Sequence, residues 1–394
     1  MTRPFRLFIV AGEASGDALG ARFVARLRDV LGDRPLELSG IGGEALIAEG
    51  LHSAFPQEDI AVMGFGPVVA RLPLLLRRMA DAARAAAAFK PDLLLTIDAP
   101  DFSLRVARKV RRLAPAVPIA HWVCPSVWAW RQGRARRMKP HVDRILALLP
   151  FEPAALERLG GPETVYVGHP LIERLQEYRP GPDEAARRDE TDAPTILVLP
   201  GSRRSEIRHL LPPFGEAVAL VAEQLPRARF VLPAVSRLVE AITQLTADWR
   251  VKPEIVTGEA GKLAAFREAR AALAASGTVT LELALAQVPT VAAYRGAAWE
   301  AVLARRLIKL PSVILPNLII GESVVPEFIQ DEASPQALAG ALLAAIADGP
   351  ARQRQLDGFA SVEQSMRSAG PSPAANAVDA ALALLREPTG GSIS

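Results

Sequence analysis

Two turns in the second half of the chain have residue types and spacing that suit phosphate binding. Each follows a short apolar run, 195–199 or 271–274, and precedes a segment with helical periodicity. Free backbone N–H groups and the positive end of a helix dipole meet at such a turn, which favours an anion. The two turns contribute Gly201, Ser202, Arg203, Ser276, Gly277 and Thr278. Together they predict a nucleotide site, although either turn alone is also typical of a helix start without a ligand.

Two charged side chains extend this chemistry. The guanidinium of Arg203 is a permanently charged, forked donor that suits a phosphate. Glu282 follows Thr278 by about one helical turn, where its carboxylate can accept hydrogen bonds from ribose hydroxyls. We therefore expect this half of the chain to bind both the phosphates and the ribose of a nucleotide.

The first half carries acidic residues at two strand ends, where polyphosphate would be repelled. Glu13, Ser15 and Asp17 follow the first apolar run, in a turn that lacks both the Walker lysine and the dinucleotide glycine spacing. Asp98 follows another apolar run, and ligands of open α/β sheets bind at such strand ends, so we expect Asp98 to be catalytic. Capping of the next helix is an equal interpretation for Ser15 or Asp17, and it is the interpretation for Asp101.

The segment 121–131, HWVCPSVWAWR, contains three of the five tryptophans and continues into further basic residues. Aromatic residues interleaved with arginine can stack nucleic-acid bases. A proline-broken loop at a strand end favours instead the wall of an apolar or sugar pocket, and Trp122 is also typical of a core residue.

Short apolar runs alternate with helical patterns along the whole chain, which is typical of parallel sheets with crossover helices. The expected fold class is α/β, with two Rossmann-like domains facing a cleft. The expected strands are 6–11, 36–39, 93–97, 118–123, 145–149, 165–167, 195–199, 230–233, 254–256, 271–274 and 288–293, with an amphipathic helix at 102–113.

The expected domain boundaries follow from a break in this pattern. Residues 178–194 are rich in charge and proline and lack apolar periodicity, which predicts a linker. It divides an N-terminal catalytic domain, 1–177, from a nucleotide-binding domain, 195–350, and a C-terminal helical segment, 351–394, follows.

Composition excludes several classes of protein. A net charge of +3 over 394 residues does not favour nucleic acid, and a single cysteine, Cys124, excludes internal disulfides and cysteine-rich zinc sites. The five histidines show no metal-ligand spacing, so we expect no metal, and His169 is interpreted as structural. No apolar run is long enough to span a membrane, and the N-terminus predicts a buried strand, so we expect a cytoplasmic protein.

A series of motifs resembles the lipid-A-disaccharide synthases, a family of bacterial glycosyltransferases. Ser103 and Cys124 depart from the family pattern, where asparagine and serine are expected, so neither side chain is assigned a role. The motifs occur in order over most of the chain: AGEASGDALG at 11–20, IDAPDF at 97–102, PSVWAWR at 125–131, LPFE at 149–152, VGHP at 167–170, LPGSR at 199–203, ASGT at 275–278 with Glu282, and LPN at 315–317.

The resemblance implies a GT-B-like, inverting, metal-free transfer of 2,3-diacylglucosamine from its UDP donor to 2,3-diacylglucosamine 1-phosphate. It implies Asp98 as the general base, with Glu13 as the second choice and Ser15 and Asp17 positioning the acceptor. Asn317 joins the nucleotide-sugar-binding residues. The resemblance also implies a homodimer, in which the C-terminal segment packs on the N-terminal domain or is exchanged, and it implies no cofactor.

Other functions fit the same features. A peptidoglycan-type N-acetylglucosaminyl transferase or a UDP-sugar epimerase would share the architecture. A non-catalytic nucleotide-binding membrane adaptor would use the same turns and basic surface.

The segment 63–79 predicts a membrane-facing surface. It is too short and too interrupted by proline and arginine to span a bilayer, but acylated substrates need an entrance from one. We expect it to contact the cytoplasmic face of the inner membrane, although a core helix with a basic rim has the same periodicity. The surface would comprise Phe65, Val68, Val69, Leu72, Leu74, Leu75, Leu76, Arg77 and Arg78.

Overall fold

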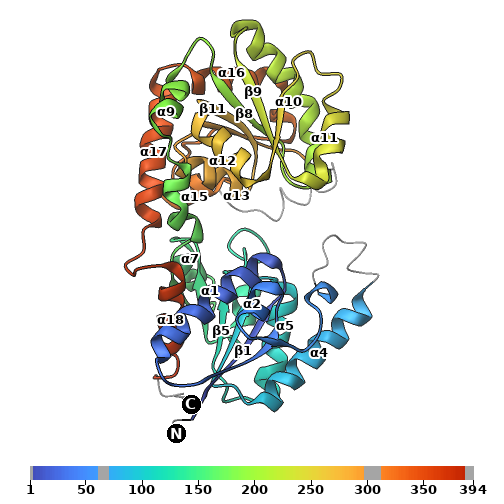
Figure 1. Cartoon of the computed structure of the whole chain (residues 1–394), viewed down its shortest axis with the longest axis vertical. Helices are drawn as coiled ribbons and strands as arrows, with labels where there is room; N and C mark the ends of the chain where they lie inside the picture. The colour runs from blue at the N-terminus through green and yellow to red at the C-terminus, as the bar shows by residue number, and fades with distance from the viewer. Residues whose placement is uncertain (1–2, 61–70, 297–311, 387–394) are drawn as a thin grey trace. The chain divides into compact units, whose positions relative to one another are not determined.

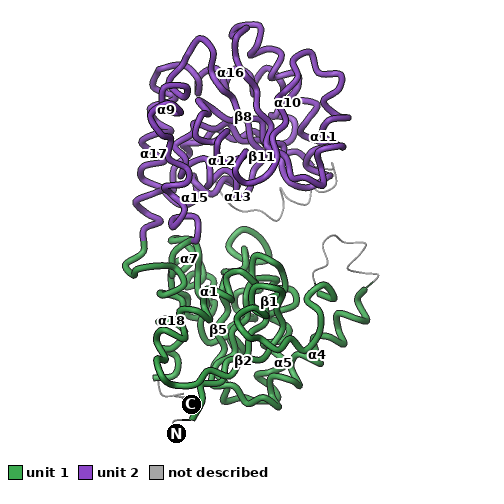
Figure 2. The backbone as a smooth tube through the Cα atoms, viewed as in Figure 1, with its two compact units in different colours: residues 1–169, 368–394 green, residues 170–367 purple. Residues whose placement is uncertain are grey.

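The chain forms two compact units, each built on one parallel sheet (Figures 1 and 2). The computed structural model describes residues 3–60, 71–296 and 312–386. Unit 1 comprises residues 1–169 and 368–394, and unit 2 comprises residues 170–367. The expected α/β class is confirmed.

The sheet of unit 1 has seven strands in the order β3-β2-β1-β4-β5-β6-β7, and every described pair is parallel. The chain leaves β1 on one side and later continues from β4 on the other, so a topological switch point lies at the carboxyl ends of β1 and β4. Both acidic turns, with Glu13 and with Asp98, begin there. The strands are β1 (Phe5–Ala11), β2 (Leu36–Ile41), β3 (His52–Ser53), β4 (Leu93–Ile97), β5 (Ile119–Trp122), β6 (Arg144–Ala147) and β7 (Glu163–Tyr166).

Helices cover both faces of this sheet (Figure 1). In α5, Phe102, Val106 and Val110 are buried at helical spacing, and the basic residues lie on the other faces, as the periodicity predicted. The helices are α1 (Ala14–Leu31), α2 (Glu44–Ala48), α4 (Leu72–Phe89), α5 (Pro100–Leu113), α6 (Gly133–Met138), α7 (Glu152–Arg158) and α18 (Pro373–Ala383), with the 3₁₀ turn η1 (Gln57–Asp59).

The sheet of unit 2 repeats this topology with six strands, in the order β10-β9-β8-β11-β12-β13. Every described pair is again parallel, and the switch point lies at the carboxyl ends of β8 and β11. Both predicted phosphate turns follow these two strands. The strands are β8 (Thr195–Leu199), β9 (Arg229–Ala234), β10 (Glu254–Thr257), β11 (Ala271–Ala275), β12 (Thr290–Tyr294) and β13 (Glu327–Ile329).

The strands of unit 2 that flank the switch point are fully buried and apolar, as expected for a parallel sheet covered on both faces. Its helices are α8 (Leu175–Tyr178), α9 (Pro182–Asp189), α10 (Arg204–Gln224), α11 (Val239–Leu245), α12 (Gly258–Glu268), α13 (Thr278–Leu285), α15 (Leu315–Ile320), α16 (Pro335–Ile346) and α17 (Pro350–Met366). Short 3₁₀ turns are η2 (Pro170–Arg174), η3 (Ser236–Leu238) and η4 (Gln330–Glu332).

The segment expected to be a linker instead lies within unit 2. Tyr178 is fully buried, and the Arg188 guanidinium donates hydrogen bonds to the carbonyls of Phe266, Arg267 and Ala286. A buried guanidinium needs several acceptors, and the backbone supplies them here. The charge and proline content of 178–194 therefore did not indicate a free connection.

The C-terminal segment divides between the two units. Helix α17 belongs to unit 2, and residues from Ser368 onward belong to unit 1 (Figure 2). There α18 packs against α1, Arg144 donates a 2.8 Å hydrogen bond to the carbonyl of Ala380, and Asn376 donates one of 2.9 Å to that of Val167. Unit 1 therefore contains a helix, α18, that comes from the other end of the chain.

Candidate functional site

A cavity of about 580 Å³ lies in unit 2 at the carboxyl ends of its central strands. Both predicted phosphate turns line it, together with Glu282 at the end of the first turn of α13. Residues that the sequence did not single out also line it, namely Pro233, Ala234, Val235, Ser236, Gly258, Glu259 and Lys262. The structure therefore brings all the predicted nucleotide residues except Asn317 to one place.

The first turn is organised by Glu206, which sequence reasoning missed. Its Oε2 atom accepts hydrogen bonds from the N–H groups of Ser202 and Arg203, at 3.0 and 3.2 Å, and so caps α10. Gly201 has a φ of +104°, and an added Cβ would lie 2.3 Å from the Glu206 carboxylate. The N–H groups expected to hold phosphate are therefore already bonded to a side chain.

The guanidinium of Arg203 remains the main cation of this turn. Its side chain is 71% exposed and makes a 3.2 Å ion pair with Glu206 Oε1. An exposed pair of this kind is weak and can exchange for a phosphate, which offers more negative charge.

The second turn leaves a helix terminus open to the cavity. Gly277 has a φ of +143°, and α13 begins at the next residue, Thr278. The N–H of Ser276 donates to the carbonyl of Ala293 at 2.9 Å, so it is not available to a ligand. The first N–H groups of α13 have no acceptor within the helix, which makes this terminus the better anion position of the two.

Glu282 is held by two neighbours. Lys262 Nζ lies 2.8 and 3.0 Å from its two carboxylate oxygens, and the Tyr178 hydroxyl donates to Oε1 at 3.4 Å. Burial and the nearby Glu282 carboxylate raise the pKa of Tyr178, so the phenol stays a donor. Lys262 adds a second cation to the cavity, in a helix whose sequence gave no motif for it.

Asn317 does not line this cavity. It is buried, and its amide donates to the Val325 carbonyl and Ser312 Oγ and accepts from the N–H groups of Val324 and Val325. All of its polar positions are used in holding the loop after α15, so the structure does not bring Asn317 together with the other predicted nucleotide residues.

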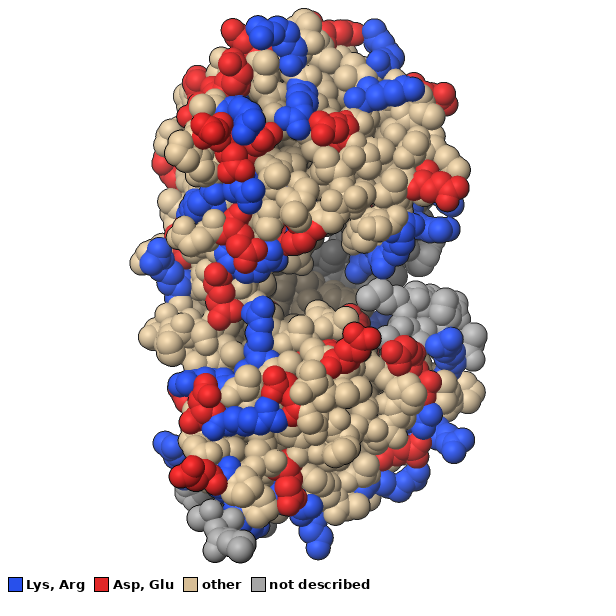
Figure 3. Space-filling model, viewed as in Figure 1, with Lys and Arg blue, Asp and Glu red and all other residues tan. Residues whose placement is uncertain are grey.

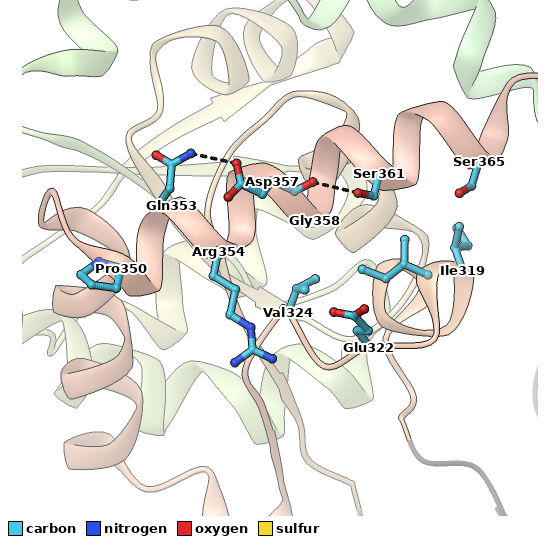
Figure 4. A pocket seen from close by; sticks show the side chains of 11 residues that line it. Ile319, Glu322, Val324, Pro350, Gln353, Arg354, Asp357, Gly358, Ser361 and Ser365 are labelled. Atoms are coloured by element: carbon cyan, nitrogen blue, oxygen red, sulfur yellow. Dashed lines mark hydrogen bonds between the residues drawn. The ribbon is translucent and has the colours of Figure 1, made fainter.

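Unit 2 has another cavity, of about 640 Å³, between α15 and α17 (Figure 4). Gln353 and Asp357 are hydrogen-bonded to each other along its α17 wall at 2.9 Å, and Ser361 donates to the Asp357 carbonyl. None of the predicted site residues lines it.

In unit 1, Asp98 lies in a strained turn beside the glycine turn. Asp98 and Ala99 have φ values of +50° and +42°, a conformation that costs energy for residues with side chains. The Asp98 N–H donates to the Trp122 carbonyl at 2.9 Å, and a Cβ added at Gly12 would lie 2.6 Å from Ala99 Cβ. The close approach of the two acidic turns therefore requires glycine at position 12.

The environment of Asp98 favours proton transfer. Desolvation by burial raises the pKa of its carboxyl above the ordinary value of 3.8, partly opposed by a backbone hydrogen bond from Ala99. A carboxylate with a raised pKa is a stronger base, which is how enzymes prepare general bases.

The neighbouring turn divides into a structural and a surface part. Asp17 is buried and accepts from the N–H groups of Gly43, Ala45 and Leu46 at 2.7, 2.9 and 3.2 Å. Its carboxylate therefore caps α2, which favours the capping interpretation of Asp17 over the positioning of an acceptor. Ser15 is exposed in the first turn of α1, and the Glu13 carbonyl accepts from Gln57 Nε2 at 3.1 Å.

The aromatic segment also divides. Trp122 is fully buried and packs against Phe23, which confirms the core interpretation. Trp130 is 41% exposed, with the Arg131 guanidinium 4.4 Å from its ring centre. Asp101 is an exposed partner of Arg134, at 3.0 Å, rather than a helix cap.

A buried carboxylate at the start of α7 was not predicted. Glu152 accepts from Trp128 Nε1 at 3.1 Å and from the N–H groups of Leu148 and Leu149 at 3.1 and 3.0 Å. Desolvation raises its pKa to about 7, although these hydrogen bonds lower it. It anchors the loop that carries the tryptophans.

Two buried histidines are poor bases at neutral pH. Desolvation lowers the pKa of His121 to about 3 and that of His169 to about 4. Within the described ranges, no group of histidine, cysteine or acidic residues is arranged to hold a metal ion.

The predicted membrane surface is partly corrected. Leu72 and Leu76 are 42% and 46% exposed on α4, but Leu75 is 8% exposed and belongs to the core. Arg77 is exposed, and Leu74 is half-buried. Phe65, Val68 and Val69 lie outside the described residues.

Arg78 is also less available than expected. It pairs with Asp59 at 2.6 Å and lies over the Phe55 ring. Of the helices in the described part of the chain, none has both the length and the apolar character needed to cross a bilayer.

Comparison with known proteins identifies the family. A family model described as lipid-A-disaccharide synthetase matches residues 7–380. The chain belongs to the lipid-A-disaccharide synthase family. A family member from Nitrobacter winogradskyi is 50% identical over 382 residues, which cover 97% of this chain and 96% of that protein. The resemblance carried by the sequence motifs is confirmed.

Solved structures at low identity show the fold of this synthase family member. A putative UDP-N-acetylglucosamine 2-epimerase from Listeria monocytogenes has a TM-score of 0.60 at 14% identity and covers 97% of this chain and 96% of its own. MurG from Acinetobacter baumannii has a TM-score of 0.57 at 15% identity, with coverage of 96% and 99%. The GT-B-like fold of two Rossmann-like domains is confirmed, and fold likeness alone carries no activity.

Proposed function

We propose that this chain transfers 2,3-diacylglucosamine from its UDP donor to 2,3-diacylglucosamine 1-phosphate, with inversion at the anomeric carbon. The products are lipid A disaccharide 1-phosphate and UDP. The observation that carries the proposal is the donor-type cavity at the switch point of unit 2, in a member of the lipid-A-disaccharide synthase family.

The donor nucleotide binds in the cavity of about 580 Å³ in unit 2. The diphosphate lies between the Arg203 guanidinium and the N-terminus of α13, where the N–H groups of Gly277 and Thr278 donate to it. The ribose hydroxyls donate to Glu282, whose orientation is fixed by Lys262 and Tyr178.

Asp98 is the general base. It takes the proton of the acceptor's primary hydroxyl as that oxygen forms a bond to the anomeric carbon. The bond from the anomeric carbon to the phosphate oxygen breaks, and UDP leaves with the electron pair. Glu13, in the adjoining turn, is the second candidate for this role.

The negative charge that develops on the departing diphosphate needs donors already in position. Arg203, Lys262 and the first N–H groups of α13 are such donors, since all of them line the cavity. Their partners Glu206 and Glu282 keep the two cations in place before the nucleotide arrives.

The exposed part of α4 faces the inner membrane from the cytoplasm. Leu72 and Leu76 supply apolar area, and Arg77 supplies a cation for anionic headgroups. The protein thus works as a peripheral enzyme, and it acts as a homodimer.

The deciding experiment is mass spectrometry of the products formed from the two purified monosaccharide lipids. A disaccharide 1-phosphate with stoichiometric UDP supports the proposal. An epimerised sugar, a product only with a peptidoglycan-type lipid acceptor, or nucleotide binding without UDP release would each replace it with one of the alternative functions.

A further inference from the structure

A cationic groove in unit 1 has no assigned role. It has a volume of about 570 Å³ and lies among α4, α5 and α6. Over the face drawn in Figure 3, acidic and basic side chains are interspersed, whereas the lining of this groove is almost entirely of one sign. Six of its basic residues are Arg105, Arg108, Lys109, Arg112, Arg131 and Arg137.

The positive charge of the groove is not neutralised within the described part of unit 1. Asp101 is the only acidic residue in the described lining, and it is paired with a further arginine, Arg134, at 3.0 Å. Among the described residues, no ion pair involves any of the six other cations. An anion that entered would meet several unpaired guanidinium groups, which are the residues of choice for phosphate.

The pKa of a histidine in the same groove reflects the positive charge of the groove. His141 lines the groove, and its pKa is lowered by burial and then by Arg108, Arg111 and Arg112. The cations of α5 therefore act together on a group inside the groove.

The lining of the groove also includes apolar side chains. Leu104, Met79 and Met138 are buried there, and Leu76 is 46% exposed at the edge formed by α4. A ligand that joins a phosphate to alkyl chains would match both parts of this lining.

The groove begins beside the proposed base. Asp101 follows Asp98 by three residues, so their Cα atoms are at most ~11 Å apart. Arg134 also donates to the carbonyl of Pro100 at 2.8 Å, which ties α6 to the same turn. The two ends of one sugar could therefore reach Asp98 and the first cations of the groove.

We propose that this groove binds the 1-phosphate of the acceptor sugar while its primary hydroxyl faces Asp98. The proposal rests on the function proposed above and names residues for its acceptor. A phosphomonoester carries nearly two negative charges at neutral pH, which suits two or three arginines. Arg105 and Arg108 are exposed on successive turns of α5. Among the described residues, neither side chain makes a hydrogen bond or an ion pair, so these are the residues to change.

The test compares two acceptors in detergent micelles free of anionic lipid. The variant is Arg105→Gln with Arg108→Gln, and the matched control is Arg158→Gln, an exposed arginine on α7 outside the groove. One acceptor carries the 1-phosphate, and the other is the same diacylated sugar with a free 1-hydroxyl. Affinity for each acceptor is also measured without donor.

We expect the double variant to lose at least about tenfold in kcat/KM for the phosphorylated acceptor, since charged hydrogen bonds are the strong ones. The KM for the UDP donor, the rate with the unphosphorylated acceptor and the control variant should match the wild type. Equal loss with both acceptors, or no loss, would overturn the proposal.

Two further outcomes are informative. One distinguishes the acceptor's 1-phosphate from the phosphate of bilayer headgroups, and the other distinguishes failure of the groove proposal from failure of the proposed function. A defect that appears only on vesicles containing anionic phospholipid, equally for both acceptors, would assign the groove to bilayer headgroups instead. If the wild type forms no disaccharide but still binds the diacylated sugar in a phosphate-dependent way that the double variant loses, the groove stands and the proposed function fails.

Discussion

The two units have the same sheet topology and opposite chemistry at the same place. In each, two adjacent strands carry their turns to a topological switch point. In unit 2 the turns present Arg203 and an open helix terminus, and Lys262 of α12 lines the same cavity, so this end of the sheet attracts an anion. In unit 1 they present Glu13 and Asp98, which repel polyphosphate and can accept a proton.

The difference shows that the fold supplies a position and a few side chains decide its use. Strain is also distributed differently. Unit 2 uses glycine at the positive-φ positions of its two phosphate turns, Gly201 and Gly277, whereas unit 1 places Asp98 and Ala99 in that region. Strain held by non-glycine residues is a feature of functional sites, which strengthens the case for Asp98.

The largest effect should come from Asp98→Asn. The substitution keeps the shape of the side chain and removes the base, so kcat should fall by roughly 10²–10⁴-fold. UDP affinity in calorimetry should stay within error, because the cavity proposed for the nucleotide lies in unit 2. Turnover like that of the wild type would break the assignment of proton transfer to unit 1, and Glu13→Gln then becomes the test.

The pH dependence follows from the same carboxyl. Because burial raises its pKa above 3.8, the base becomes protonated at a higher pH than an ordinary aspartate. As the pH is lowered, kcat/KM should therefore begin to fall at a pH higher than 3.8. In Asp98→Asn this fall should be lost together with the activity. A profile flat down to the ordinary pKa of aspartate would contradict it.

A buried carboxylate should make the stability of unit 1 depend on pH. The pKa of Glu152 is raised from 4.5 to about 7, so the folded state binds the proton more tightly than the unfolded state. Its contribution is fully present below pH 4.5 and is lost as the pH rises toward 7, by up to ~3 kcal/mol. Denaturant unfolding at about pH 4 and about pH 8, on either side of this loss, measures the difference. Glu152→Gln should remove that slope, and an unchanged slope would assign it to other groups.

The nucleotide affinity of unit 2 should fall by a smaller factor. Arg203→Ala removes a charged donor to the diphosphate and should weaken UDP binding by roughly 10–100-fold. Glu282→Ala should weaken it less, since it removes a ribose contact but frees Lys262 from its ion pair. Calorimetry with UDP measures both. The matched control is Arg250→Ala, because Arg250 is an exposed arginine of unit 2 that does not line the cavity.

The two variants together test where UDP binds. Unchanged affinity in both variants would move the donor site away from the cavity in unit 2. Unchanged folding, measured by thermal unfolding, excludes an indirect cause.

Much of the fold was predictable because its signals are local. Strands β4 and β8 begin and end where the apolar runs predicted. The two phosphate turns were predictable because small residues directly follow buried strands. Strands β3 and β13, of two and three residues, were missed because they are too short to form an apolar run.

The roles that sequence reasoning missed depend on contacts between distant residues. Asp17 caps the distant helix that begins at Glu44, and Asn317 holds a loop that no motif marks. Lys262 meets Glu282 only because α12 and α13 flank the same cavity. Side-chain partners of this kind follow from packing, so the sequence pattern alone does not reveal them.

Two neighbouring leucines of α4 should differ in their effect on stability, because Leu75 is buried and Leu76 is exposed. Leu75 shares a buried face with Met79, Ala82 and Ala86, a helical spacing that sequence reasoning could have used. Leu75→Ser should therefore cost roughly 2–5 kcal/mol in denaturant unfolding, as for other truncations of buried leucines. Leu76 is 46% exposed, so Leu76→Ser should change the stability by less than ~0.5 kcal/mol.

The same pair tests the membrane surface. Leu76→Ser, alone or with Leu72→Ser, should lower binding to anionic liposomes in a flotation assay while the melting temperature stays near that of the wild type. Activity should fall on vesicle-presented acceptor and persist in detergent, because the catalytic turn of Asp98 is untouched. Liposome binding that survives in the double variant would remove α4 from the membrane surface, and the cations of unit 1 would then be the next residues to examine.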